Sequence, residues 1–489
     1  MTMSPKDFYK KLHTAFADGG SRDVYVHYQE RHSYDELYSV MCRLNTKLSA
    51  YRGQAIGVYS GKSFSAYGAI FASIISGNTW VPINPVLPWN RIVNMLDAAQ
   101  AKVLIVDSDL SDEFSAYVVA NEIELIDLRN LPKEETSFDL SRIDDDGVAY
   151  VMFTSGSTGV PKGVPMTHVN YINFIENALN ILPFEDGDVF SDYHDFGFDL
   201  SIFYLFCAPL VGGAFAPGVD DRDSLMPLRH IQENKVTVLS SVPSIISRVR
   251  QLNPRGPVDT PIRIAFLCGE PFRLDILEYC QDVLELPNIY NFYGLTETGV
   301  ENFYHPCQKG DVETYAEMGY VPIGTPLPGN DVDISEDGEL VLAGEQLMSG
   351  YLGGRGVERF FEEDGKRWFL TGDRVVLYKD KYFCKGRLDS QVKVSGYRVD
   401  LMDIEAHLRR IDGISEAVSF VVSMGGREFI VGAYQGNPNM DGEGIRAALS
   451  KMLPDYMIPR SLMNVDEMPL NKNGKVDRPK IRELYEQRD

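Results

Sequence analysis

The stretch Val148-Ala-Tyr-Val-Met-Phe153, followed directly by Thr154-Ser-Gly-Ser-Thr-Gly-Val-Pro-Lys-Gly163, decides what fold and chemistry to expect of this chain. Its first part is short and apolar, which is typical of a buried strand. Its second part holds three glycines, four hydroxyl side chains and a lysine. Glycines let backbone N–H groups approach phosphate oxygens, while the hydroxyls and Lys162 add donors and charge. Such a loop after a strand is suited to hold a triphosphate, and a surface turn is the plain alternative.

The loop is not a P-loop, which needs a glycine, four residues and then Gly-Lys-Ser/Thr. The similar stretch Gly57-Val-Tyr-Ser-Gly-Lys-Ser63 is one residue short of that spacing. Gly474-Lys475 fails as well, because Val476 follows it. We interpret residues 57–63 as an ordinary turn between a strand and a helix.

Strand-like runs alternate with helical patterns on both sides of this loop. The runs are short, apolar and β-branched, and they cover residues 55–59, 101–107, 148–153, 236–239 and 264–267. This alternation predicts α/β layers with parallel sheets. Residues 330–385 instead show short strands joined by turns, which predict a small antiparallel unit. The last hundred residues are mixed, and the polar link 386–390 is the candidate boundary.

The predicted fold class is therefore α/β plus α+β. A large N-terminal domain, residues 1–388, would contain two layered α/β subdomains and a small β-barrel-like subdomain at about 330–385. Residues 389–489 would form a small α+β domain.

Composition and charge limit the partners. The chain has 489 residues, 44% hydrophobic and 24% charged, and its 47 Lys and Arg against 70 Asp and Glu give a net charge of −23. An acidic surface repels nucleic acid and anionic membranes, so we expect neither nucleic-acid binding nor membrane insertion. Residues 389–489 hold 14 basic and 16 acidic residues, a net of −2, which leaves −21 for the rest. The near-neutral tail could dock an acidic partner.

Cysteines and apolar runs indicate the compartment. The six cysteines are scattered without a CxxC pair, which argues against a disulfide scaffold and a cysteine zinc site. Residues 1–16 lack an apolar signal core, and no apolar run is long enough to span a bilayer. We expect a cytoplasmic protein.

Four further motifs follow the loop along the chain. They are Tyr293-Gly-Leu-Thr-Glu297, Thr371-Gly-Asp373, Gly386-Arg-Leu-Asp-Ser-Gln-Val-Lys-Val-Ser-Gly-Tyr-Arg398 and Asn471-Lys-Asn-Gly-Lys-Val-Asp477. In this order, and together with the loop, they resemble the motifs of the adenylate-forming enzymes, which include acyl-CoA synthetases, luciferases and the adenylation domains of nonribosomal peptide synthetases. Leu295 departs from the pattern, in which proline is commoner. The resemblance covers nearly the whole chain.

The resemblance implies a first reaction in which a carboxylate attacks the α-phosphorus of ATP, with Mg²⁺ as cofactor, to give an acyl-adenylate and pyrophosphate. Charge builds on the phosphoryl oxygens, so catalysis rests on positioning and electrostatic stabilisation. The implied nucleotide-binding residues are Thr154, Ser155, Gly156, Ser157, Thr158, Gly159, Lys162, Gly269, Glu270, Asn291, Tyr293, Gly294, Asp373 and Arg387.

Within that set the resemblance implies individual roles. Tyr293 would stack on adenine, Asn291 would bind its amino group, and Asp373 would accept hydrogen bonds from the ribose. Among the implied catalytic residues, Thr296 would contact the α-phosphate and Glu297 would hold Mg²⁺. The plain alternatives are a core aromatic for Tyr293 and a turn residue for Asp373.

In the family that this chain resembles, the C-terminal domain swings about a hinge residue. The resemblance implies that Asp389 is this hinge. In one pose Lys475 would bridge the substrate carboxylate and the α-phosphate. In the other, the segment from Lys393 to Gly396 would line a tunnel for a phosphopantetheine thiol. Taken alone, the turn around Lys475 reads as a solvated hairpin, in which Lys472 is the more exposed lysine.

Asp199 lies in the apolar run Phe196-Gly-Phe-Asp-Leu-Ser-Ile-Phe203, where a carboxylate must be paired or exposed. By resemblance it pairs with the α-ammonium group of an amino acid, and a helix N-cap is the alternative. The implied pocket lining is Leu200, Phe203, Ser240, Phe266, Cys268, Phe292, Val300 and Glu301. Three phenylalanines favour a small side chain. Glu301 would suit a hydroxyl or a second cation, unless it is a surface glutamate.

The sequence thus predicts an AMP-forming ligase that loads a small amino acid on a separate carrier protein bearing phosphopantetheine. It resembles stand-alone adenylation domains, among them D-alanine–carrier protein ligases and proline-activating enzymes. No carrier, condensation or thioesterase domain is recognised in the chain, so we expect it to act in trans. An acyl-CoA ligase for a small or aryl acid and a catalytically silent adenylate-binding paralogue are the alternatives.

Overall fold

The computed structural model describes residues 3–154, 161–388, 391–424, 427–437, 440–469 and 476–488. The chain divides into two compact units. Unit 1 comprises Met1–Pro85, Leu96–Phe153 and Gly163–Gly386, and unit 2 comprises Val86–Met95, Thr154–Lys162 and Arg387–Asp489.

The first sheet is six-stranded, in the order β6-β5-β3-β4-β7-β8. Its strands are β3 (Ala55–Tyr59), β4 (Thr79–Ile83), β5 (Val103–Val106), β6 (Glu124–Asp127), β7 (Val148–Thr154) and β8 (Lys162–Thr167). The pairs that join β3 to β4 and β5, β4 to β7 and β5 to β6 are parallel. Along the chain, helices precede or separate these strands: α2 (Tyr34–Leu48), α3 (Phe64–Ile75), α4 (Trp89–Ala99) and α5 (Asp112–Ala120). This confirms the α/β layer predicted around the glycine-rich loop.

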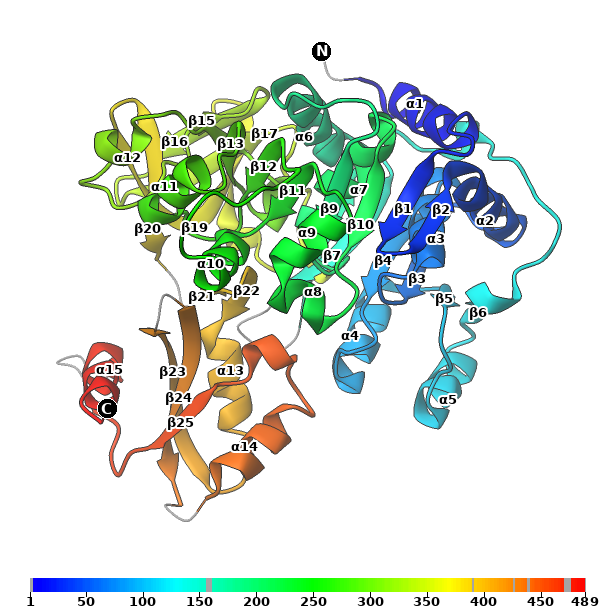
Figure 1. Cartoon of the computed structure of the whole chain (residues 1–489). Helices are drawn as coiled ribbons and strands as arrows, with labels where there is room; N and C mark the ends of the chain where they lie inside the picture. Colours follow the sequence, from blue (N-terminus) through cyan, green and yellow to red (C-terminus); the bar gives the residue numbers. More distant parts are fainter. Residues whose placement is uncertain are drawn as a thin grey trace. The chain divides into compact units, whose positions relative to one another are not determined.

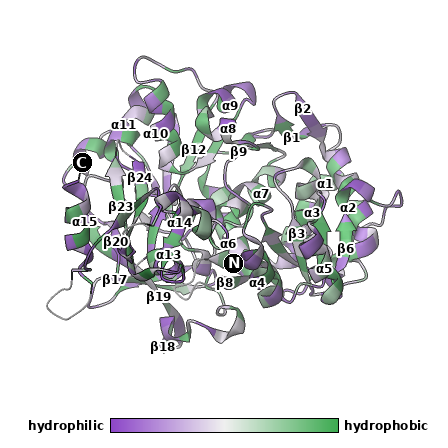
Figure 2. Ribbon diagram, turned by 90° about the horizontal axis from the view of Figure 1, so that it is seen from below, coloured by the Kyte–Doolittle hydropathy of each residue, from purple (hydrophilic) through white to green (hydrophobic). Residues whose placement is uncertain are grey.

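The second sheet is nine-stranded, in the order β15-β14-β13-β12-β11-β9-β10-β1-β2 (Figure 1). Its strands are β1 (Asp23–His27), β2 (Glu30–Ser33), β9 (Val189–Asp192), β10 (Ala214–Pro217), β11 (Val238–Ser241), β12 (Ile264–Leu267), β13 (Asn288–Tyr293), β14 (Phe303–Pro306) and β15 (Thr325–Pro326). The middle strands are parallel, whereas β2, β14 and β15 pair antiparallel at the edges. Figure 2 shows the inner strand β12 as hydrophobic and the edge strand β2 as hydrophilic.

Eight further α-helices of the described residues precede or connect the strands of the second sheet. They are α1 (Pro5–Ala17), α6 (His168–Ile181), α7 (Leu200–Leu210), α8 (Asp221–Leu225), α9 (Pro227–Glu233), α10 (Pro243–Leu252), α11 (Leu274–Asp282) and α12 (Asp311–Thr314). One strand begins two residues later than the sequence predicted. The strand expected at 236–239 begins at Val238, because the chain leaves α9 through Lys235, whose φ is 55°.

Helix α3 joins the two sheets into one core. It packs on β3 and β4 of the first sheet. From the same helix, the Tyr67 ring stacks on Phe215 of β10, with ring centroids 4.6 Å apart. Ten of the twelve residues of α3 are buried, which agrees with its uniformly apolar sequence.

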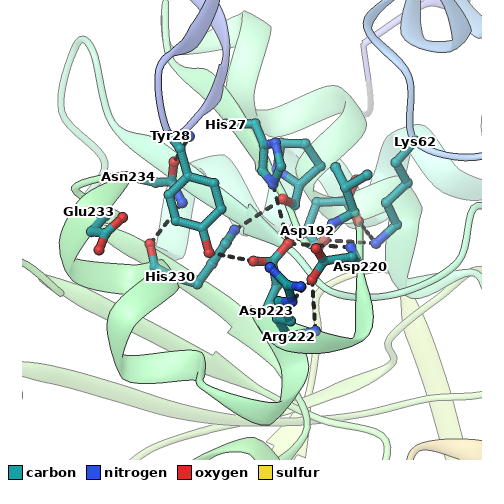
Figure 3. A network of polar contacts seen from close by, with 12 residues as sticks. His27, Tyr28, Lys62, Asp192, Asp220, Arg222, Asp223, His230, Glu233 and Asn234 are labelled. Atoms are coloured by element: carbon teal, nitrogen blue, oxygen red, sulfur yellow. Dashed lines mark hydrogen bonds and ion pairs between the residues drawn. The ribbon is translucent and has the colours of Figure 1, made fainter.

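A polar network reinforces this junction (Figure 3). The Lys62 ammonium lies 2.8 Å from Oδ1 of Asp192, at the end of β9, and Tyr67 donates to the same carboxylate. In the network His27 Nε2 and the Tyr28 hydroxyl contact Asp223, at 3.3 and 2.5 Å. Lys62 belongs to residues 60–63, the ordinary turn between β3 and α3 that the sequence predicted, while residues 57–59 are the end of β3 itself. The lysine is engaged in an ion pair.

Residues 330–387 form a five-stranded sheet. Its strands are β16 (Asn330–Ile334), β17 (Glu339–Gly344), β18 (Phe360–Glu363), β19 (Lys366–Tyr378) and β20 (Lys381–Arg387). The pairs β16–β17, β17–β19 and β18–β19 are antiparallel, as predicted for this segment.

Unit 2 is an α+β arrangement, also as predicted. A hairpin of β21 (Gln391–Val394) and β22 (Tyr397–Asp400) precedes α13 (Leu401–Leu408). A three-stranded sheet follows, made of β23 (Ile414–Met424), β24 (Arg427–Gly436) and β25 (Ser461–Asn464), with α14 (Gly442–Leu449) and α15 (Arg478–Glu486). Arg478 at the start of α15 forms an ion pair with Glu405 of α13, at 2.6 Å.

Two predictions about covalent and membrane features can be compared with this fold. All six cysteines lie in described residues, and none of them forms a disulfide there. Across the ranges given above, no helix combines the length and the apolar character that crossing a bilayer requires.

His168 gives the fold a predicted sensitivity to acid. The imidazole is 2% exposed at the start of α6, where its Nδ1 lies 2.7 Å from the Tyr9 hydroxyl. Burial, only partly offset by Asp144, lowers the pKa of His168 from 6.5 to about 4. The unfolded chain therefore binds this proton more readily than the folded protein does.

We predict that the free energy of unfolding falls as the pH drops from 6.5 toward 4, with His168 contributing up to about 3 kcal/mol. His168→Gln keeps a polar partner for Tyr9 and removes the titrating group, so it should flatten this part of the pH dependence. Urea unfolding of both proteins across that range measures the effect. Identical pH slopes would contradict it.

Candidate functional site

The carboxyl ends of β9, β11, β12 and β13 gather most of the predicted site residues of unit 1. These strands are parallel neighbours, so their carboxyl ends meet at one edge of the sheet, where α/β proteins usually bind ligands. Ser240 lies near the end of β11, and Cys268 to Glu270 follow β12. Asn291 to Tyr293 end β13, and Gly294 follows that strand. Asp199 follows β9 and precedes α7.

Three of the predicted lining residues form a continuous aromatic stack. The Phe203 ring of α7 lies on Phe266 of β12, with centroids 3.9 Å apart and planes at 16°. Phe266 in turn lies on Phe292 of β13, at 4.2 Å and 26°. All three are 2% exposed or less, as are Cys268 and Ser240 beside them, while Leu200 is 6% exposed. The residues that the sequence assigned to the lining of a substrate pocket are therefore buried and lie close together.

Asp199 occupies the N-cap position of α7 without capping it. Its φ and ψ, −58° and −26°, are helical, and its side chain makes no cap hydrogen bond. Tyr150 of β7 is fully buried, and its pKa is raised well above 10 by burial and then by the nearby Asp199 carboxylate. Asp199 therefore occupies the N-cap position that the alternative predicted, but its carboxylate does not make the hydrogen bond of a helix cap.

The turn after β13 is unusually tight. A Cβ at Gly294 would lie 2.1 Å from the carbonyl oxygen of Val300 and 2.4 Å from Cα of Glu301, so only glycine fits there. Val300, a β-branched residue, has a φ of 81°, a conformation that such residues rarely adopt. The Gln346 amide holds this backbone, because its Nε2 donates to the carbonyls of Thr298, Gly299 and Glu301 at 2.8 to 3.2 Å.

Two acidic side chains are fixed by this turn. Glu297, in the short helix η3 (Thr296–Thr298), is 1% exposed and accepts a hydrogen bond of 2.7 Å from the Tyr351 hydroxyl. A buried carboxylate held in this way could bind a hard divalent cation such as Mg²⁺. Glu301 is 2% exposed, so the alternative of a surface glutamate is wrong. Thr296 is half-buried beside Glu297.

The residues expected around adenosine are also brought together. The Tyr293 hydroxyl donates to Oδ2 of Asp373, at 2.5 Å, although the two residues are 80 apart in sequence. Asp373 lies within β19, so the alternative of a turn residue is wrong. Tyr293 is 5% exposed and packs on Phe303, which fits a core aromatic as well as a stacking platform.

Other predicted nucleotide contacts have protein partners. Asn291 Nδ2 donates to the carbonyl of Pro322 at 2.8 Å. The Glu270 carboxylate accepts from the backbone N–H of Ser244 at 2.9 Å and from the Ser244 hydroxyl at 3.1 Å. Gly269 has a φ of 76°, which suits glycine.

Several predicted residues belong to unit 2 or lie outside the described residues. Thr154 ends β7, Lys162 begins β8, Arg387 ends β20, and Lys393 pairs with Arg398 in the β21–β22 hairpin. Outside the described residues lie Ser155, Gly156, Ser157, Thr158, Gly159, the hinge residue Asp389 and Lys475.

Sequence reasoning missed three residues of this site. Tyr150 lies near Asp199, Tyr351 binds Glu297, and Gln346 holds the tight turn. No local motif marks them, because each acts on a segment that lies about fifty residues away in sequence. Tyr150, next to the glycine-rich loop, was assigned only to a buried strand.

Comparison with known proteins identifies the family. Residues 12–352 match the family described as AMP-binding enzyme, and the chain belongs to that family. This agrees with the adenylate chemistry that the five motifs led us to expect.

Among particular relatives, the D-alanine–D-alanyl carrier protein ligase of Staphylococcus aureus is 28% identical over 493 residues, covering 98% of this chain and 99% of the ligase. Polyketide synthase PksN of Bacillus subtilis is 29% identical over 88% of this chain, which spans only 8% of that synthase. Syringomycin synthase SyrB1 of Pseudomonas syringae is 28% identical over 91% of this chain and 77% of its own length.

Solved structures show the same fold. The Vibrio cholerae adenylation domain AlmE, in complex with glycyl-adenosine-5′-phosphate, superposes with a TM-score of 0.85 at 23% identity, covering 98% of both chains. The structure called IdnL7 superposes with a TM-score of 0.72 at 26% identity, covering 100% of this chain and 99% of that one.

The tight turn can be tested by adding one methyl group. Gly294→Ala would force the Val300 backbone to move, so we predict a loss of stability of about 1–3 kcal/mol and at least a tenfold weaker affinity for ATP. Gly444→Ala is the control, because a Cβ there meets nothing within 4 Å and the residue lies in helix α14. Thermal unfolding and ATP titration calorimetry measure both effects. An ATP affinity that Gly294→Ala leaves unchanged would mean that the turn does not shape the nucleotide site.

Proposed function

We propose that this protein uses ATP to activate a small amino acid as its aminoacyl-adenylate and then transfers the aminoacyl group to the phosphopantetheine thiol of a separate carrier protein. One observation carries the proposal: the Asp199 carboxylate, at the start of α7, lies one helical turn before Phe203, where the aromatic stack begins. A carboxylate suits an α-ammonium group, and three stacked phenylalanines beyond it favour a small side chain.

Two relatives support this substrate class. The S. aureus relative, which matches over nearly its whole length, is named for D-alanine and its carrier protein. AlmE was solved with a glycyl-adenylate. Glycine and alanine are therefore the first substrates to test, and serine is a further one because Glu301 could accept a hydrogen bond from its hydroxyl.

In the proposed first step a carboxylate oxygen of the amino acid attacks the α-phosphorus. The bond from that phosphorus to the bridging oxygen breaks, and pyrophosphate leaves. Glu297 would hold Mg²⁺, which supplies positive charge against the phosphate oxygens. Tyr351 fixes the Glu297 carboxylate through its hydrogen bond, and Asp199 would orient the substrate by its ammonium group. Tyr293 and Asp373 would bind adenosine.

In the proposed second step the carrier thiol, as thiolate, attacks the acyl carbon. The bond from that carbon to the oxygen that bridges it to phosphorus breaks, and AMP leaves with that oxygen. We infer that the C-terminal domain, residues 389–489, serves both steps by turning at Asp389, which would bring Lys475 to the substrates first and Lys393 to the thiol's path later. Gating by domain rotation is common in enzymes. Residues 389–489 carry a net charge of only −2, so they would repel an acidic carrier less than the rest of the chain, whose net charge is −21.

Pyrophosphate exchange into ATP over a panel of acids tests the function. We predict exchange with glycine, alanine or serine and at least a hundredfold less with leucine or phenylalanine. Propionate and benzoate serve as matched acids without an ammonium group. Exchange with those acids alone would favour the acyl-CoA ligase, and a panel with no exchange at all would favour a silent paralogue.

Replacement of Asp199 tests how the ammonium group is recognised. With Asp199→Asn we predict that kcat/KM for the amino acid falls by about 10²–10³ while that for the deaminated acid changes little, because a charge-assisted hydrogen bond worth about 3–4 kcal/mol is lost. Exchange kinetics with the matched pair measure this ratio. Unchanged discrimination between the two acids would refute the role of Asp199.

Replacement of Lys475 separates the two half-reactions. With Lys475→Ala we predict that the barrier to adenylate formation rises by about 3 kcal/mol or more, while thioester formation from preformed aminoacyl-adenylate survives. Lys472→Ala is the matched control in the same motif. Equal losses in both half-reactions for Lys475→Ala would contradict a lysine that serves one pose only.

A further inference from the structure

One cluster of metal-ligating side chains contains none of the proposed site residues, although His305 is the cross-strand partner of Asn291. In the part of the chain that the structure describes, His305, Cys307 and Asp311 are the single group of three such side chains whose ligand atoms all lie within 4.8 Å of one another. His305 belongs to β14, Cys307 follows that strand, and Asp311 begins α12. The three residues therefore come from one short segment at the antiparallel edge of the nine-stranded sheet.

The segment is held rigidly by its own backbone. Cys307 N–H donates to the carbonyl of Ile289 at 2.8 Å, which extends the pairing of β14 with β13 by one residue. Gln308 N–H donates to Oδ2 of Asp311 at 2.8 Å, which closes the turn between the strand and α12. The three candidate ligands are thus positioned before any ion binds.

The polar atoms of this cluster are only partly satisfied by the protein. His305 is 4% exposed, and its Nε2 lies 2.8 Å from Oδ2 of Asp311. Its other ring nitrogen, Nδ1, is buried and has no hydrogen-bond partner among the described residues. Both hydrogen bonds to Asp311 end on Oδ2, so no described residue donates to its Oδ1. Buried polar atoms are rarely left in this state without a ligand or water.

Solvent reaches the cluster from one side. A groove of about 750 Å³ is lined by Pro306, Cys307 and Gln308 together with residues 281–282 and 285–290 and Lys309. Cys307 is half-buried and forms part of its wall. An ion could enter through the groove, and a water molecule could complete its coordination from there.

We propose that His305, Cys307 and Asp311 form a binding site for a divalent zinc-type cation, with the groove supplying the fourth ligand. A nitrogen, a thiolate sulfur and a carboxylate oxygen are the donor set that Zn²⁺ prefers, whereas Mg²⁺ and Ca²⁺ prefer oxygen alone. Tetrahedral bonds of about 2.0–2.3 Å place donor atoms roughly 3.3–3.7 Å apart, so small side-chain rotations suffice. On binding, Cys307 loses its thiol proton to solvent and the sulfur bonds to the ion.

A site of this kind is compatible with the cysteine pattern of the chain. The absence of CxxC pairs excludes sites built mainly from cysteine. It does not exclude a single cysteine combined with histidine and aspartate. The site is independent of the proposed ligase activity, so its test needs no catalysis.

Cobalt substitution provides a direct test. The metal-free full-length protein is titrated with Co²⁺ alone, without ATP, and followed by optical absorption. We expect one Co²⁺ per chain, with the intense visible bands of tetrahedral cobalt and a near-ultraviolet band from the thiolate-to-cobalt transition. Zn²⁺ should displace the cobalt and remove both bands.

Matched variants identify the ligands. Cys307→Ser should abolish the thiolate band and weaken Zn²⁺ binding by about a hundredfold or more, because even indirect partners of a metal usually contribute tenfold to a hundredfold. Cys384→Ser, at another half-buried cysteine, should leave both unchanged. Asp311→Asn provides a second ligand variant, and circular dichroism of the metal-free proteins checks that each is folded. No stoichiometric tetrahedral cobalt spectrum, or a thiolate band that survives Cys307→Ser, would overturn the proposal.

Discussion

The close approach of Gly294 to the backbone of Val300 is the constraint on which the site depends. The chain reverses here with no room for a Cβ, and it places Val300 in a conformation that a β-branched residue rarely adopts. Such strain persists only where surrounding contacts outweigh it. Here Gln346 contributes three hydrogen bonds to the carbonyls of the turn. Tyr293, Glu297 and Glu301 all take their positions from this reversal.

A second constraint is the aromatic stack. Phe203, Phe266 and Phe292 come from three different elements and stack at about 4 Å, which joins α7 to the carboxyl ends of β12 and β13. The same contact does two things. It contributes to the core of unit 1 by burying large apolar surfaces, and it would line the proposed pocket for the substrate side chain. Under the proposed function, stability and substrate size would depend on one set of side chains, so truncating them to admit a larger substrate would also cost stability.

The buried carboxylates of this acidic chain each have a defined environment. The body of the chain is strongly acidic, and yet its buried carboxylates have specific partners: Asp192 with Lys62, Asp373 with Tyr293, and Glu297 with Tyr351. Asp199 stands at the start of α7 without capping it, and its charge acts on the buried Tyr150. At the far edge of the same sheet, His305, Cys307 and Asp311 offer a donor set of a different chemical kind.

The sequence by itself determined the α/β layers, because strands and helices are recognised from local features, namely the spacing of apolar residues and the turn residues between them. It also selected most site residues, since the five motifs are contiguous. It could not decide whether Glu301 is buried or whether Asp199 caps its helix, because burial and hydrogen bonding depend on segments far along the chain. Only the tertiary structure brought Tyr351 to Glu297, Gln346 to the tight turn and Tyr150 toward Asp199. These contacts join elements that no local pattern relates, because Tyr150 lies in β7 of the six-stranded sheet, while Gln346 and Tyr351 follow β17 of the antiparallel sheet.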